Sequence, residues 1–319
     1  MRLFSLIFLA CHAFAQTTVA QTQFALPLDC EIGTTCFIED YVDNAPEPGR
    51  QQDYACGINS RDGHKGTDIA LLDFGAIDSG VTVRAAAPGT VLRVRDGMAD
   101  DRLMRGVTSQ NACGNAVLVD HGNDLQTMYC HLKEGSVRVQ PGTPVETGTA
   151  LGMVGLSGQT NHPHLHFQVL RAGNVIDPFR PDGTGTCGAA EGSLWAVDLP
   201  YTKTGLITAG FSDHVPEFDA VRDGSARLAQ GTPDTPLVVY AHAGHAEHGD
   251  LLTIFATDPD GTEIFRRESV LKAPQVSIMR AAGKQAPPEG WPPGEYLGEA
   301  LLTRAGKVIA HRFAHVTVR

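Results

Sequence analysis

Short apolar runs separated by glycine and proline constrain this sequence more than any other feature. Glycine and proline supply 35 and 19 of the 319 residues. No long stretch keeps the 3.6-residue apolar period of an amphipathic helix, whereas short apolar runs recur with turn residues between them. The sequence therefore predicts an all-β protein built from antiparallel sheets.

Two groups of such runs predict two domains. We expect a first domain over residues 27–190, a linker over 191–204 and an immunoglobulin-like β-sandwich over 205–319 that supplies no catalytic group. The polar tract at 96–112 reads as a surface insertion of unknown role. In the first domain we expect strands at Val81–Arg84, Thr90–Val94, Ala116–Val119, Thr127–His131, Ser136–Val139, Ala150–Val154 and Leu165–Leu170. In the second we expect them at Leu237–Tyr240, Leu251–Ala256, Glu263–Phe265, Val276–Met279, Tyr296–Thr303 and Val308–Val318.

The charge pattern excludes one class of partner. Lys and Arg number 25 and Asp and Glu 36, for a net charge of −11. The basic residues are scattered and form no stripe of the kind that binds phosphate backbones. We therefore expect no nucleic-acid partner.

The first 15 residues predict export. Arg2 precedes an apolar run from Leu3 to Ala10, and Ala13-Phe14-Ala15 fits a signal-peptidase site. The run is too short for a membrane span, and no later run approaches the required length. We expect a periplasmic or secreted protein with no transmembrane span in the mature chain. Lipidation of Cys11 is the alternative.

Six cysteines remain after the signal peptide, and an exported chain favours disulfide bonds between them. Cys113 and Cys130 flank a predicted hairpin that turns at residues 121–124, so folding brings them opposite each other. Cys30 and Cys36 close a short loop. Cys56 and Cys187 then pair by elimination.

The first motif that indicates a catalytic or metal-binding site is His164-Leu165-His166-Phe167. Side chains alternate along a strand, so the two histidines face the same side. Upstream, His64 and Asp68 are four residues apart, and Gly66 between them lets the backbone turn. Two imidazoles and a carboxylate suit zinc and leave one coordination position open.

The same set predicts hydrolysis. If His64, Asp68 and one histidine of the pair bind metal, the other histidine and His131 remain beside it for proton transfer. Zinc lowers the pKa of a bound water to about 7 and polarises a carbonyl oxygen. Amide hydrolysis is therefore the expected reaction.

These residues resemble the lysostaphin-type or LytM-type zinc endopeptidases of bacterial cell walls. The resemblance covers residues 56–180 and follows the family order H-x-x-x-D, G-N-x-V-x-x-D-H-G, Y-x-H-L, V-x-x-G-x-x-V-x-x-G and H-L-H-F. Here these motifs are His64–Asp68, Gly114–Gly122, Tyr129–Leu132, the segment from Val139 to Gly148, and His164–Phe167.

The resemblance implies particular roles. It implies that His64, Asp68 and His166 bind one zinc ion per chain and that His131 and His164 line the reaction site. It also implies peptidoglycan as the substrate. Departures from the family pattern, at Cys113, Cys130, residues 160–163 and Gln168, leave subsite preference open.

Other histidines favour structural roles. His121 lies in the hairpin turn, and His162 precedes a proline. The repeat from His242 to His248, which includes His245, is interpreted as a loop and not as a second metal site.

Two other functions compete with a wall endopeptidase. Relatives that have lost zinc ligands are non-catalytic regulators of wall hydrolases, whereas this chain keeps all five residues. An exported protease that cleaves glycine-rich proteins is the second. For the C-terminal domain, two roles are open: contact with substrate or a protein partner, or a mere spacer.

Overall fold

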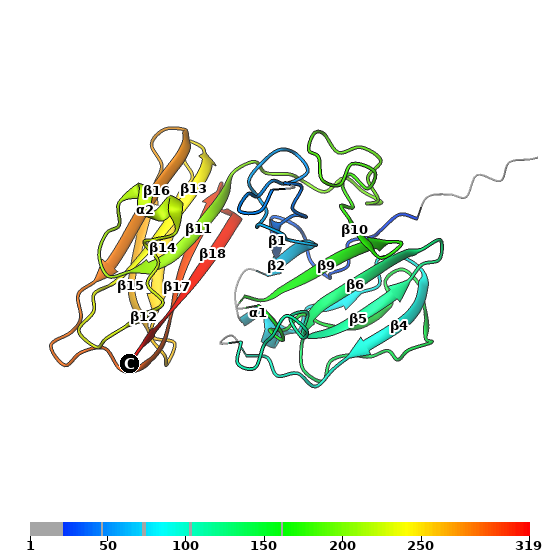
Figure 1. The fold of residues 1–319 in the computed structure, drawn as a ribbon, viewed down its shortest axis with the longest axis horizontal. Coiled ribbons are helices and arrows are strands. Elements are labelled where there is room, and N and C mark those ends of the chain that lie inside the picture. Colours follow the sequence, from blue (N-terminus) through cyan, green and yellow to red (C-terminus); the bar gives the residue numbers. More distant parts are fainter. Residues whose placement is uncertain (1–21, 46, 72–74, 102–103, 161) are drawn as a thin grey trace, which may run out of the picture.

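The computed structural model describes residues 22–45, 47–71, 75–101, 104–160 and 162–319 (Figure 1). The predicted signal peptide at 1–15 and Cys11 lie outside these residues. Within the described ranges, no helix has the length and hydropathy needed to cross a membrane.

One large antiparallel sheet organises the first part of the chain, residues 22–204. Its order is β1-β2-β9-β6-β5-β4-β7, with β10 paired to β9, which makes eight strands among the described residues. The strands are β1 (Cys36–Asp40), β2 (Thr67–Leu71), β4 (Gly89–Arg95), β5 (Asn115–Asp120), β6 (Leu125–Leu132), β7 (Pro144–Val145), β9 (His164–Arg171) and β10 (Asn174–Ile176).

A small sheet completes this part. It pairs β3 (Thr82–Arg84) with β8 (Ala150–Met153), and the short helix α1 (Gly75–Ser79) precedes it. The predicted strand at Ser136–Val139 is wrong. Arg138 N–H donates to Leu151 O at 2.9 Å, and the Ser136 hydroxyl accepts from Met153 N–H at 3.0 Å. The segment is therefore joined to β8 by single hydrogen bonds and not by the regular ladder of a strand.

The core of this part lies under the large sheet and shows why alternating residues form these strands. Along β9 the side chains of Leu165, Phe167 and Val169 are fully buried. They share one apolar cluster with residues such as Ile69 of β2 and Tyr129 of β6. The opposite side of β9 therefore carries His164 and His166, as the alternation predicts.

Two further sheets form the second part, residues 205–319, which we call the C-terminal unit. One has the order β11-β13-β16 and the other β12-β18-β17-β14-β15. Residues of both sheets contribute to one shared core. The elements are β11 (Gly205–Ser212), α2 (Phe218–Asp223), β12 (Gln230–Gly231), β13 (Leu237–Ala246), β14 (Leu251–Thr257), β15 (Glu263–Val270), β16 (Gln275–Lys284), β17 (Gly294–Arg304) and β18 (Lys307–Val318).

This strand distribution is compatible with the predicted immunoglobulin-like sandwich. In that fold the strands named A, B and E share one sheet and C, F and G the other. Here β11, β13 and β16 lie in one sheet and β14, β17 and β18 in the other. The immunoglobulin-like assignment and the domain boundaries stay proposals.

The interpretation of His242–Ala246 as a loop is wrong. These residues extend β13, where Gly244 pairs with Gly205 of β11 and with Ser277 of β16. His242 donates to or accepts from the Ser277 hydroxyl at 2.7 Å. Pairing on both sides of the strand compensates for the weak strand preference of Gly and Ala.

The two parts of the chain are in contact. Figure 1 shows β18 as the strand of the C-terminal unit that lies nearest β1 and β2. Arg312 of β18 forms ion pairs with Glu39 and Asp40 of β1, at 3.0 and 2.7 Å. His311 of β18 also lies against His162, with its Nδ1 3.3 Å from His162 Nε2.

The described cysteines form three disulfide bonds. They join Cys30 to Cys36, Cys56 to Cys187 and Cys113 to Cys130. These are the pairs that the sequence predicts. The bond between Cys56 and Cys187 spans 131 residues and ties the start of the large sheet to the segment after it.

The three bonds have different expected effects on stability. A cross-link restricts the unfolded chain more when it closes a longer loop, so we expect loss of about 5 kcal/mol for the Cys56–Cys187 pair and about 2 kcal/mol for Cys30–Cys36. Urea unfolding of the two double-alanine variants measures both losses. Equal losses would contradict the loop-length argument.

Candidate metal centre

Three neighbouring strands bring the candidate residues together. In the pairing of β2 with β9, Asp68 lies opposite His166. In the pairing of β6 with β9, Cys130 lies opposite His166, and His131 follows it. Because residues directly opposite each other in paired strands share a face, the side chains of Asp68 and His166 meet.

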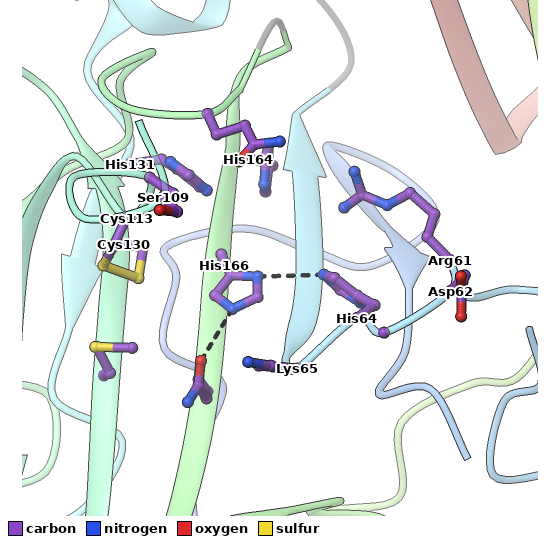
Figure 2. A pocket seen from close by; sticks show the side chains of 15 residues that line it. Arg61, Asp62, His64, Lys65, Ser109, Cys113, Cys130, His131, His164 and His166 are labelled. Atoms are coloured by element: carbon purple, nitrogen blue, oxygen red, sulfur yellow. Dashed lines mark hydrogen bonds between the residues drawn. A yellow bond between two sulfur atoms is a disulfide. The ribbon is translucent and has the colours of Figure 1, made fainter. Parts of the chain in front are cut away.

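Three donor groups converge above this point. His64 Nε2 lies 2.9 Å from Asp68 Oδ2, His166 Nδ1 lies 2.8 Å from Asp68 Oδ1, and the two ring nitrogens are 3.2 Å apart. One donor atom from each of the three residues lies within 4.8 Å of the others. Figure 2 shows a ring nitrogen of His166 directed at a ring nitrogen of His64.

The close approach depends on Gly66. A Cβ at this position would lie 2.6 Å from His166 Cε1 and 2.9 Å from Phe167 O. Any side chain would therefore collide with the imidazole and with the backbone of β9. The absence of a side chain lets the segment between His64 and Asp68 pass against His166.

Burial and charge act in opposite directions on this group. Asp68 is fully buried. Burial is the largest effect and alone would raise its pKa, but the electrostatic attraction of the surrounding His64, His164 and His166 outweighs burial and holds the pKa well below its ordinary value. For His64, burial lowers the pKa, yet Asp68 raises it above the ordinary value. The site therefore holds an ionised carboxylate and favours cations beside it.

His131 and His164 form the next layer. Their ring centroids are 4.7 Å apart. His131 Nδ1 lies 2.8 Å from Ser157 O, and His164 Nδ1 lies 2.9 Å from His162 O. Because a carbonyl oxygen only accepts, each Nδ1 carries the proton and each Nε2 is the free nitrogen of the neutral ring.

The electrostatics favour a neutral His131. Burial is the main cause that holds its pKa well below the ordinary value, and the neighbouring His164 and His166 add to it. Burial also lowers the pKa of His164, although Asp68 opposes this. His164 Nε2 lies 3.6 Å from Asp68 Oδ2.

All four histidines open onto one pocket, and Asp68 lies beneath them. The pocket is also lined by groups that the sequence analysis did not single out, among them Arg61, Lys65, Ser109 and Gln159. Figure 2 shows the disulfide between Cys113 and Cys130 on the His131 side of the pocket. Ser109 comes from the 96–112 segment, which therefore forms part of the pocket wall.

Arg61 is the main residue that sequence reasoning missed. Its guanidinium donates to Asp68 Oδ2 and lies 2.7 Å from Asp40 Oδ2. Its position three residues before His64 is the only signal in the sequence, and that spacing by itself predicts no contact.

The other histidines lie outside this centre. His121 binds Pro88 O at 2.7 Å and the Thr127 hydroxyl at 2.8 Å. His162 Nε2 donates to Leu71 O at 2.7 Å. Neither residue belongs to the metal-ligand group found among the described residues.

Comparison with known families identifies this part of the chain. Residues 62–178 match the model of peptidase family M23. These residues form an M23 domain. The match contains His64, Asp68, His131, His164 and His166.

The M23 domain is similar to several bacterial proteins. It is 27% identical over 117 residues to the peptidoglycan DD-endopeptidase ShyA of Vibrio cholerae, covering 37% of this chain and 22% of that protein. It is 34% identical over 116 residues to the DD-carboxypeptidase/endopeptidase Mpg of Neisseria meningitidis, covering 36% of this chain and 22% of that protein. The chain thus spans about a fifth of the length of these relatives.

A solved structure of a zinc-containing peptidase from Vibrio cholerae is also similar. It is 24% identical, with a TM-score of 0.30, and the match covers 45% of this chain and 41% of that one.

Gly66 provides a test of the geometry that needs no metal. We expect Gly66→Ala to lower the free energy of unfolding of the metal-free protein by about 1–3 kcal/mol, because its Cβ overpacks against His166. Urea unfolding measures the loss.

Gly231→Ala is the control. The atoms nearest to its added Cβ would be those of the Thr235 side chain, at 3.3 Å or more. If both variants unfold at the same urea concentration, His166 is not confined by Gly66.

Proposed function

We propose that the M23 domain binds one zinc ion through His64, Asp68 and His166. Zinc–nitrogen bonds of about 2.0–2.1 Å in a tetrahedral site place ligand atoms about 3.3 Å apart. The distances of 2.8, 2.9 and 3.2 Å between the three donor groups are close to that value. The nitrogen, nitrogen and oxygen donor set also suits zinc and leaves a position for substrate or water.

The surroundings of His64 support this assignment. Its Nδ1 donates to Tyr41 O at 2.7 Å. Metal-binding histidines usually donate their second ring N–H to a carbonyl or carboxylate, which fixes the tautomer and orients the other nitrogen toward the metal. Nε2 of His64, the nitrogen nearest Asp68 and His166, is therefore the one that can bind the metal.

His131 and His164 supply proton transfer. Bound zinc supplies an activated water and polarises a carbonyl oxygen. The neutral His131 holds its proton on Nδ1 against Ser157 O, so its Nε2 can accept a proton from the attacking water and return one to the leaving amine. His164, held by His162 O beside the Asp68 carboxylate, can stabilise negative charge as it takes up a proton.

The function that this site supports best is hydrolysis of amide bonds in peptidoglycan, in peptide stems or cross-links, by an exported zinc endopeptidase. The observation that carries it is one pocket lined by four histidines, two of which meet the buried Asp68 carboxylate beneath it, while the other two bind carbonyl oxygens through Nδ1 and keep Nε2 for proton transfer. The activities named for the two bacterial relatives support the same substrate class. The predicted signal peptide supports export to the compartment that holds the wall.

The metal assignment is tested by zinc content. We expect about one zinc per wild-type chain and strong loss in His64→Ala and Asp68→Ala, because either change leaves two protein ligands. Inductively coupled plasma mass spectrometry of the desalted proteins measures it. His248→Ala, an exposed histidine of the C-terminal unit, is the control and should keep its zinc. Unchanged content in both site variants would reject the assignment.

Wall cleavage is tested by mass spectrometry of muropeptides released from purified walls of several cross-link types. We expect release by the zinc-loaded wild type. His131→Ala and His164→Ala should keep zinc and lose at least about a hundredfold in rate, the effect typical of general acid and base groups. Zinc binding with no release from any wall would favour a binding or regulatory protein. Cleavage of glycine-rich proteins instead would favour the other alternative.

A further inference from the structure

A residue of the C-terminal unit reaches the surroundings of the metal centre. Arg312 of β18 lies beside β1, where its Nη1 is 3.0 Å from Glu39 Oε1 and its Nη2 is 2.7 Å from Asp40 Oδ1. The Arg312 side chain is only 13% exposed. This is therefore a largely buried ion pair between two parts of the chain that are 272 residues apart.

Asp40 connects Arg312 to the centre. It pairs with Asp68 across β1 and β2, so two buried carboxylates lie on directly opposite residues. Like charges in such positions repel each other unless cations lie between them. Arg61 occupies that place, with Nε 2.7 Å from Asp40 Oδ2 and Nη2 donating to Asp68 Oδ2.

Ion pairs with these two carboxylates hold the Arg61 guanidinium. Its side chain is 53% exposed, whereas those of Asp40 and Asp68 are 1% and 0% exposed. Burial raises the pKa of Asp40, but Arg312 and Arg61 outweigh this and hold the pKa below its ordinary value. Asp40 is thus an ionised group shared by two guanidinium groups.

A second contact of β18 reaches the other side of the site. His311 Nδ1 lies 3.3 Å from His162 Nε2. The carbonyl of His162 is the acceptor that holds His164 Nδ1, and Thr160 Oγ1 lies 3.1 Å from the same nitrogen. Two consecutive residues of β18 therefore contact neighbours of the site. Arg312 contacts Asp40, which lies opposite Asp68, and His311 contacts His162, which holds His164.

We propose that strand β18 positions the metal centre, with Arg312 as a positioning residue that acts on Asp68 through Asp40 and Arg61. The inference rests on the proposed zinc site. The proposal gives the C-terminal unit a role in positioning Asp68 of the M23 domain, which the sequence of the unit does not indicate.

Loss of Arg312 has a definite physical consequence. Asp40 would keep only Arg61, and Glu39 would lose the guanidinium that it contacts. An unpaired buried carboxylate is strongly unfavourable. The half-exposed Arg61 is free to move toward them and away from Asp68. Asp68 would then lose the donor that orients it, and loss of such outer partners weakens metal binding.

Zinc affinity of the full-length protein tests the proposal, measured by competition with a chromophoric chelator. We expect Arg312→Gln to weaken zinc binding by about 3- to 30-fold, the range for residues that act through an intermediate group. Arg312→Lys keeps the charge and should restore part of the affinity. Arg266→Gln removes an exposed arginine that pairs with Glu263 on β15 and should change nothing.

A double-mutant cycle separates positioning from general loss of structure. In an Asp40→Asn background, Arg312→Gln should cause less than about a twofold further change, since the route to Asp68 is already broken. If Arg312→Gln weakens zinc binding in that background as much as it does in the wild type, Arg312 does not act through Asp40. Unchanged zinc affinity in Arg312→Gln alone would overturn the proposal.

A measurement on metal-free protein keeps the proposal separate from the zinc assignment. Hydrogen–deuterium exchange of peptides covering residues 61–71 should be at least about threefold faster in Arg312→Gln than in wild type or Arg266→Gln. Faster exchange in a protein that binds no zinc would reject the proposed function and keep the positioning contact. Equal exchange would reject the contact, whatever the zinc result.

Discussion

The arrangement of this site depends on the fully buried carboxylate of Asp68. Asp68 lies within β2, in the middle of paired strands, and a buried ionised group is stable only when cations or donors surround it. His64, His166 and Arg61 satisfy this requirement from three directions. The same requirement makes the group a good binding site for a cation, because the field that attracts the imidazoles also attracts a metal.

The histidines divide into two kinds by the partners of their rings. His64 and His166 each place a ring nitrogen within 2.9 Å of an Asp68 oxygen. His164 Nε2 stays 3.6 Å from Asp68, and His131 is held through Nδ1 by Ser157 O. This difference follows from strand position, since His166 lies opposite Asp68 and His131 lies at the end of β6. The proposed zinc-dependent hydrolysis needs both kinds of group within one pocket, and the large sheet and the segment before β2 bring them there.

Contacts between the two parts of the chain extend this arrangement beyond the M23 domain. The β1 strand lies between β2, which carries Asp68, and β18 of the C-terminal unit. Asp40 of β1 therefore contacts both Arg312 and Arg61, and Arg61 also donates to Asp68. The 96–112 segment contributes Ser109 to the wall of the pocket.

The sequence by itself determined what depends on local period and short spacing. The alternation in His164–Phe167, the hairpin that aligns Cys113 with Cys130 and most strands follow from such patterns, because neighbours in the chain set which way a side chain points. Tertiary structure alone decided the rest. The strand at His242–Ala246 forms because β11 and β16 pair with it on both sides, and Arg312 approaches Asp40 because two sheets pack together. Such contacts join residues whose separation along the chain carries no period, so only the folded chain reveals them.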